Sequence, residues 1–231
     1  MRASSPAPIS APSQEPSEDP SSGLDLAGAL EQASALATGL DPALRYHDAR
    51  HTFDEVLPAA RALAEDLRLS GRERALVETA AAFHDLGFLE RRAGHEQAAV
   101  EMVRRLLPSR GFDSDAIERI AGMILATKLP QRPRTTLERI VADADMAVLA
   151  SKAFLRRNED LRLELMAAGG ALPRPAWIAQ QRLFLLGHRD HTTAARLRFG
   201  PGRRRNAALL AARDHRPVGR EGLSRRGALG A

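Results

Sequence analysis

A run of small and apolar residues ending at Phe83 leads directly into His84 and Asp85, and Gly87 follows two residues later. The apolar run indicates a buried helix, and the glycine indicates where that helix stops. His84 and Asp85 therefore lie where a buried helix ends, and buried polar groups are costly unless they have partners. We expect the rest of the chain to bring other polar groups to this pair.

The composition favours helices over strands. Ala, Leu, Arg and Glu are abundant, hydrophobic residues make up 44% of the chain, and aromatic residues make up only 4%. Such a composition suits helices and lacks the β-branched and aromatic side chains that strands prefer. The 231 residues can hold one domain with a full core and two tails. The expected fold class is all-α, a helical bundle.

Both ends of the chain differ in composition from the middle. Residues 1–22 are rich in Ser, Pro and Ala and are predicted to form a disordered N-terminal tail. Residues 200–231 contain eight arginines and two acidic residues, which more than accounts for the formal net charge of +5. We predict a basic, mostly disordered C-terminal tail there, with one or two helical turns at 206–213. The helical domain is then expected at residues 23–199.

The basic tail has two interpretations. Clustered arginines can bind nucleic-acid phosphates, because such binding needs only positive charge. However, no aromatic residues are interleaved with these arginines, and the tail contains no base-reading motif. A solvated tail is therefore the favoured interpretation, and a nucleic-acid partner is not expected.

The residue types also limit the chemistry and the compartment. The chain has no cysteine, so any metal must be held by His, Asp or Glu. The first residues lack the apolar core of a signal peptide, and no apolar run approaches the roughly 20 residues needed to cross a bilayer. The sequence predicts a soluble, cytoplasmic protein without a membrane partner, and it leaves the oligomeric state open.

Helix-start patterns divide the middle of the chain. Ser70 with Glu73 and Thr135 with Glu138 have the form of capping boxes, and Asp113 or Ser114 can cap another helix. Together with apolar residues at helical spacing, these signals predict helices at 24–40, 46–67 with a kink at Pro58, 70–85, 95–107, 114–127, 136–148, 151–167 and 175–198.

A few polar side chains interrupt the apolar helix faces. His47 and His51 are four residues apart, a spacing that places two side chains on one face of a helix. The His84-Asp85 doublet follows, and Asp143 and Asp145 lie on a later helix. Imidazole nitrogens and carboxylate oxygens suit divalent ions such as Mn, Fe, Co, Zn or Mg.

This order of residues resembles the HD superfamily of metal-dependent phosphohydrolases. The resemblance covers about residues 40–150 and extends more weakly to about 198. It implies an HD-type helical bundle in which His51, His84, Asp85 and either Asp143 or Asp145 hold one or two divalent ions. Asp145 is preferred, because an Ala-Asp pair followed by an apolar residue is similar to the family's motif. Asp143 would then orient a ligand or lie on a helix face.

The stretch Tyr46–His51 is also similar to the Tyr-His-Asn-x-x-His stretch of the class I cyclic nucleotide phosphodiesterases. That similarity implies that His47 donates a proton to the leaving oxygen and that His51 binds metal. The chain has Asp48 where those enzymes have Asn, and it lacks their additional substrate-binding segments. A cyclic nucleotide substrate is therefore not implied.

Other residues are candidates for substrate binding. Lys128 and Arg92 are cations that can hold a phosphate, and His95 can contact phosphate or bind a second ion, as an additional histidine does in some relatives. Each candidate also has a structural alternative. His51, His84 and Asp85 can form a hydrogen-bonded cluster without metal, and His47 can be structural. His95 can be a surface histidine, and Lys128 and Arg92 can be solvated charges.

The sequence thus predicts a metal-dependent phosphohydrolase that cleaves a phosphate ester or anhydride of a nucleotide or related small molecule by metal-activated water. His47 and Asp85 are the predicted catalytic residues. The alternative is a catalytically weak HD module that senses a nucleotide or mediates partner contacts. Nucleic-acid binding through the tail is a third hypothesis. The substrate, the identity and number of the metal ions, and the role of the tail stay open.

Overall fold

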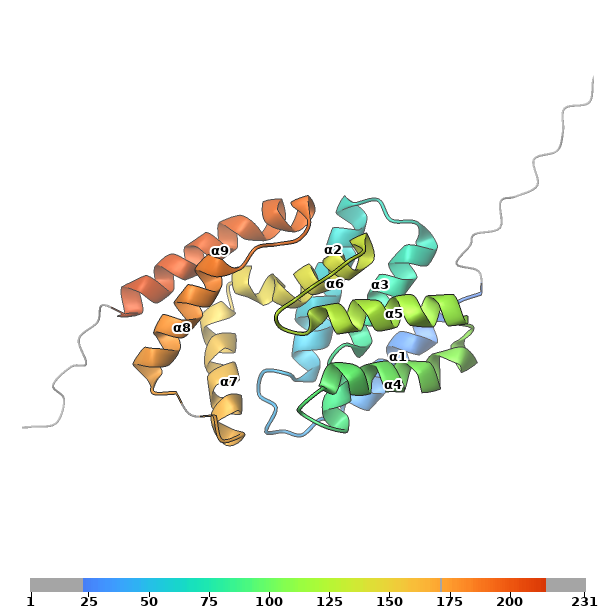
Figure 1. The fold of residues 1–231 in the computed structure, drawn as a ribbon, viewed down its shortest axis with the longest axis horizontal. Coiled ribbons are helices and arrows are strands. Elements are labelled where there is room, and N and C mark those ends of the chain that lie inside the picture. The colour runs from blue at the N-terminus through green and yellow to red at the C-terminus, as the bar shows by residue number, and fades with distance from the viewer. Residues whose placement is uncertain (1–22, 171, 215–231) are drawn as a thin grey trace, which may run out of the picture.

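The computed structural model describes residues 23–170 and 172–214, which fold into helices joined by loops (Figure 1), and no strand occurs within these ranges. The all-α fold class is confirmed. The helices are α1 (Leu26–Ala37), α2 (Leu57–Asp66), α3 (Gly71–Phe83), α4 (His95–Leu106), α5 (Ser114–Thr127), α6 (Thr136–Asp145), α7 (Phe154–Ala167), α8 (Arg174–Gly187) and α9 (Thr193–Asp214). The short elements are a π-helical turn, η1 (His51–Val56), and the 3₁₀ turns η2 (Leu86–Leu89), η3 (Leu107–Arg110) and η4 (Met146–Ala150).

The predicted helix starts are found where the capping residues placed them. Before α3, Ser70 Oγ accepts the backbone N–H of Glu73, and the Glu73 carboxylate accepts the backbone N–H of Ser70. Thr135 and Glu138 form the same pair of bonds before α6. Asp113 Oδ1 accepts a bond from the third residue of α5 at 2.8 Å. Each bond satisfies a backbone donor that the first helical turn leaves free.

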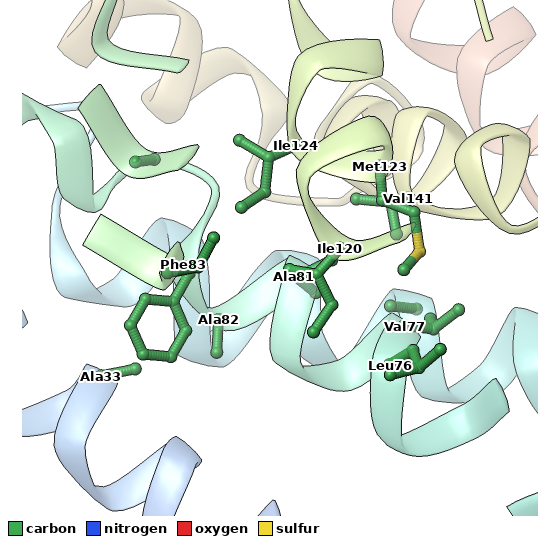
Figure 2. Packing of buried hydrophobic residues seen from close by; sticks show 14 of the residues in the cluster. Ala33, Leu76, Val77, Ala81, Ala82, Phe83, Ile120, Met123, Ile124 and Val141 are labelled. Atoms are coloured by element: carbon green, nitrogen blue, oxygen red, sulfur yellow. The ribbon is translucent and has the colours of Figure 1, made fainter. Parts of the chain in front are cut away.

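Helix α3 is at the centre of the main core. Every residue from Ala75 to Phe83 is buried, and α1, α2, α5 and α6 pack around the helix. Figure 2 shows Phe83 beside Ala33 of α1, with Ile120 and Ile124 of α5 on the other side of α3. The prediction that the helix before His84 is buried is therefore confirmed.

A second, smaller hydrophobic cluster joins η4 to the last three helices. Its buried members are Leu149, Phe154, Leu185 and Leu210. Figure 1 shows α7, α8 and α9 at the end of the molecule away from α1. Helix α9 belongs to both packing units, because Ala195 near its start lies in the main core and Leu210 lies in the small cluster.

The helix predicted at 175–198 is wrong, because the chain forms two helices with a break at residues 188–192. Asp143 on α6 accepts the backbone N–H groups of His191 at 2.7 Å and Thr192 at 2.8 Å. These two N–H groups therefore do not form hydrogen bonds within a helix. Thr192 Oγ1 then accepts the N–H of Ala195 at 3.1 Å and starts α9. A single carboxylate from a distant helix therefore sets this break, which local sequence patterns do not report.

The domain end expected at Phe199 falls inside α9, which continues through Pro201 to Asp214. Gly202 allows this helix to lie against η4, since a Cβ atom there would overlap the backbone oxygen of Ala150. Arg203 makes two bonds of 2.6 Å to Asp190, and Arg205 donates to the backbone oxygens at the end of η4. These two arginines of the predicted tail are thus structural contacts of a packed helix.

The predicted disordered tail at residues 1–22 and the last part of the basic tail, residues 215–231, lie outside the described residues. Among the described helices, none is both long enough and apolar enough to span a membrane.

Candidate metal centre

Three elements bring four polar side chains together. His51 begins η1, His84 and Asp85 follow the end of α3, and Asp145 ends α6. Ligand atoms of His51, His84 and Asp145 all lie within 4.8 Å of one another. Asp85 Oδ2 lies 3.1 Å from His84 Nε2 and 3.7 Å from His51 Nε2. We call these four residues the central cluster; all are buried except Asp145, which is partly exposed.

The end of α3 directs His84 toward the cluster. Its Nδ1–H donates to the backbone oxygen of Ala81 at 2.8 Å, so Nε2 is the nitrogen that faces the other ligands. His84 Nε2 and Asp85 Oδ2 are buried without a hydrogen-bond partner. Because unpartnered buried polar atoms are costly, this observation fits a cation held between them.

His51 is positioned by a helix start and a π-helical turn. Asp48 Oδ1 accepts the backbone N–H of His51 at 2.9 Å and so caps the helix. The expected helix face shared by His47 and His51 is therefore wrong: His47 precedes the helix, and the two rings lie 6.1 Å apart, edge to face. The N–H of Leu57 bonds Thr52, five residues earlier. Such π-helical turns are frequent at functional sites.

Glu55 fixes the ring of His51. Its Oε2 lies 3.1 Å from His51 Nδ1, so this N–H donates outward and Nε2 is left for the central cluster. A carboxylate commonly orients a metal-binding histidine in this way. Glu55 was missed in the sequence, although its spacing of four residues from His51 was the available signal.

The ionisable groups of the cluster strongly affect one another. Burial alone would lower the pKa of His51, but hydrogen bonds to Asp145 and Glu55 and the charge of Asp85 raise this pKa to about 9. Burial would raise the pKa of Asp145, but the two histidines lower it to about 2. The opposite charges of the cluster therefore favour one another's charged forms. A divalent cation would compete with protons for the same nitrogen atoms.

His95 lies on the other side of Asp85. It is the first residue of α4, and its Nε2 lies 3.5 Å from Asp85 Oδ1 while Nδ1 lies 3.1 Å from the backbone oxygen of Arg92. Helix α4 can come this close because of Gly87, where a Cβ atom would overlap the backbone oxygen of His95. The two oxygens of Asp85 therefore face different histidines.

His47 is held by Glu164, a fully buried residue of α7. Glu164 Oε1 lies 2.6 Å from His47 Nδ1, and Oε2 accepts the backbone N–H groups of Tyr46 at 2.8 Å and His47 at 3.1 Å. Arg92 donates to Oε1 at 3.0 Å. Glu164 was missed because its neighbours in the sequence suggest only a helix-face acid, and no motif links it to His47.

The ring of Phe88 contacts both His47 and His95, whose own ring centres lie 6.1 Å apart. It stacks against His47 with 4.5 Å between ring centres and against His95 with 3.9 Å. The Arg92 guanidinium lies 5.7 Å from the centre of the Phe88 ring. We call His47, Phe88, Arg92 and His95 the rim, since these partly exposed side chains surround the edge of the central cluster at Asp85.

Two candidates lie elsewhere. Lys128 is exposed at the end of α5 and lines a groove of about 440 Å³ whose lining contains no residue of the central cluster or the rim. Asp143 is fully buried and binds the start of α9 through His191 and Thr192. The geometry thus places Asp145, and not Asp143, in the central cluster. The carboxylate of Asp143 binds the segment between α8 and α9.

Comparison with known families gives one match: residues 50–147 match the family model of the HD domain. This range contains the whole central cluster and leaves out His47 and Glu164. Comparisons with curated proteins and with solved structures gave no significant match. HD domains generally occur in metal-dependent hydrolases. The cluster of His51, His84 and Asp145 can hold a metal. Residues 50–147 therefore match the HD domain, which is consistent with a protein of the HD superfamily.

Proposed function

We propose that the chain is a metal-dependent phosphohydrolase that cleaves a phosphate ester or anhydride of a nucleotide or a related small molecule. The observation that carries this proposal is the buried convergence of the central cluster, in which His84 Nε2 and Asp85 Oδ2 have no hydrogen-bond partner. We infer that His51, His84, Asp85 and Asp145 hold one divalent ion. Their nitrogen and oxygen atoms suit Mn, Fe, Co, Zn or Mg.

A divalent ion, when bound, supplies Lewis acidity that activates water and withdraws charge from a phosphoryl oxygen. Asp85 is the residue that we place next to the attacking water. Its Oδ2 faces the other ligands, and its Oδ1 faces His95, 3.5 Å away. Oδ1 is thus the oxygen that can accept a hydrogen bond from the water and keep it aligned with phosphorus.

His47 is the proposed proton donor to the leaving oxygen. Its Nδ1–H donates to the buried Glu164, which leaves Nε2 as the nitrogen that delivers the proton. The side chain is 21% exposed, so a substrate can reach it. Glu164 holds the orientation of the ring by accepting its Nδ1–H.

The rim supplies positive charge for the phosphate. Arg92 is 41% exposed and is held on one side by Glu164, so its remaining N–H groups can bind phosphate oxygens. His95 contacts the phosphate or, with Asp85 Oδ1, holds a second ion. The position of Lys128 gives no support to a role in substrate binding.

The test is metal analysis of the purified protein combined with a turnover screen. Substrates would include p-nitrophenyl phosphate, bis-p-nitrophenyl phosphate and common nucleotides, cyclic ones among them. We expect phosphate or nucleoside release that is lost on chelation and in Asp85→Ala, and retained in Asp115→Ala, a control at an exposed position of α5. Tight nucleotide binding without product release would favour a sensor module, and turnover that survives in Asp85→Ala would refute the proposal.

A further inference from the structure

Helix α7 lies beyond the segment that matches the HD domain, yet it carries an arginine whose side chain is fully buried among residues of that segment and the loop before it. Arg157 has no exposed surface. Its Nε lies 3.0 Å from Glu55 Oε1, and one terminal nitrogen lies 3.1 Å from Asp48 Oδ1. Burying a guanidinium is costly unless every N–H is bonded.

The remaining donors of Arg157 bind the backbone of the same loop. Its terminal nitrogens donate to the backbone oxygens of Arg45 at 3.0 Å and Tyr46 at 2.6 Å. The guanidinium carbon also lies 4.9 Å from the centre of the Tyr46 ring. One side chain of α7 therefore holds residues 45–48, which lead into His51.

Arg157 has three acidic partners: Asp160 on the same helix, 3.4 Å from a terminal nitrogen, and Asp48 and Glu55, which both contact His51. Glu55 binds the Nδ1–H of the ring at 3.1 Å, and Asp48 binds the backbone N–H at 2.9 Å. The ring and the backbone of this residue are thus each held by a carboxylate, and each carboxylate is held by Arg157. Without the guanidinium, two partly buried carboxylates would repel one another and turn toward solvent, and the ring would lose its fixed orientation.

We propose that Arg157 is a positioning residue of the metal centre, which directs His51 Nε2 at the central cluster through Glu55 and Asp48. Helix α7 is then part of the metal-binding unit, although it lies outside the matched HD segment. This inference rests on the proposed function, because it requires a metal ion at the central cluster. Loss of such a supporting contact typically weakens metal binding about 10–100-fold.

The test is a Co²⁺ titration of the full chain, followed by the visible absorption of the bound ion. We expect Arg157→Met to weaken Co²⁺ binding at least tenfold and to change the absorption spectrum. Arg156→Met is the matched control: its side chain is 52% exposed, and its partner Asp160, which Arg157 also approaches at 3.4 Å, is not one of the two carboxylates that bind His51. Co²⁺ affinity within about twofold of the wild type is expected for that variant.

Glu55→Gln tests the same path without touching Arg157. We expect it to weaken Co²⁺ binding as well, and we expect the double variant to lose less than the product of the two single effects, because both act on one ring. Arg157→Lys keeps the charge without the planar fork and should fall between the wild type and Arg157→Met. If Arg157→Met does not fold, as judged by far-UV circular dichroism, the Co²⁺ affinities of Glu55→Gln and Arg157→Lys still test the positioning role.

The failure of this inference differs from the failure of the proposed function. A wild-type chain that binds no Co²⁺, Mn²⁺ or Zn²⁺ would refute the metal centre itself. A wild-type chain that binds Co²⁺, together with folded Arg157 and Glu55 variants of unchanged affinity, would refute the positioning role alone. Purely additive losses in the double variant would also refute it.

Discussion

Replacing Glu164 by glutamine removes a buried negative charge while keeping the shape of the side chain. The carboxylate accepts two backbone N–H groups, the Nδ1–H of His47 and a bond from Arg92. A glutamine has one oxygen and one NH₂ group, so it cannot accept all of these bonds. The NH₂ group of the glutamine would face N–H donors instead of accepting from them. The His47 ring would then have to move its proton from Nδ1 to Nε2.

The size of the effect follows from the pKa of Glu164. Burial alone would raise this pKa, but the hydrogen bond and charge of His47 and the two backbone N–H groups lower it from the ordinary 4.5 to about 2. Since a tenfold change in proton affinity corresponds to about 1.4 kcal/mol, the ionised carboxylate contributes about 3 kcal/mol to the free energy of unfolding at neutral pH. The pKa is lower in the folded state, so this contribution is complete above pH 4.5 and is lost as the pH falls toward 2.

The measurement is urea unfolding followed by far-UV circular dichroism, from pH 7 to pH 3 in the presence of a chelator. We expect Glu164→Gln to be about 3 kcal/mol less stable than the wild type at pH 7, and about half that difference to remain near pH 3. Glu159→Gln on the same helix, which pairs with Arg162, should change stability by less than about 1 kcal/mol. A Glu164 variant as stable as the wild type at pH 7, or a difference that does not vary with pH, would refute the reasoning.

Other substitutions test the remaining assignments. Asp145→Ala should reduce the bound metal to a trace in elemental analysis. Asp143→Ala should keep the metal but lose about 2 kcal/mol of unfolding free energy in urea, because buried N–H groups stay unpaired. The reverse pattern would show that the two aspartates have exchanged roles. Gly202→Ala should cost about 1–3 kcal/mol through overlap with η4, and an unchanged melting temperature would contradict that close approach. Arg203→Met should cost about 3 kcal/mol at pH 7 by leaving the buried Asp190 without its arginine partner. Burial would raise the pKa of Asp190, but its histidine and arginine partners lower it. The loss of stability in Arg203→Met relative to the wild type should therefore shrink as the pH falls below the ordinary 3.8. A loss of stability that stays constant in melting curves recorded at different pH would contradict this.

The fold could be predicted largely from local patterns. The capping boxes at Ser70 and Thr135 mark true helix starts, and the apolar run before His84 is the centre of the core. The break before α9 could not be predicted, because Asp143 causes it from a helix about fifty residues earlier in the chain. The continuation through Pro201 likewise depends on packing against η4, and composition alone indicates a loop there.

The site was predictable where its residues form a recognisable order. His51, the His84-Asp85 doublet and a later aspartate stand in the order found in the HD superfamily, and the structure brings them together. Glu164 and Arg157 could not be found in this way. Each is a charged residue on an amphipathic helix, and only the folded chain shows that both are buried against the loop before His51.

Helix α9 passes from one hydrophobic cluster to the other, with Gly200, Pro201 and Gly202 near its middle. Proline removes one hydrogen bond from the helical ladder, and glycine stiffens the backbone least, so this segment is the natural flexing point of the helix. Leu210 of α9 packs with Phe154 of α7 in the small cluster. A bend of α9 at this segment would therefore be transmitted to the helix that carries Arg157 and Glu164, the two residues that hold the loop before His51.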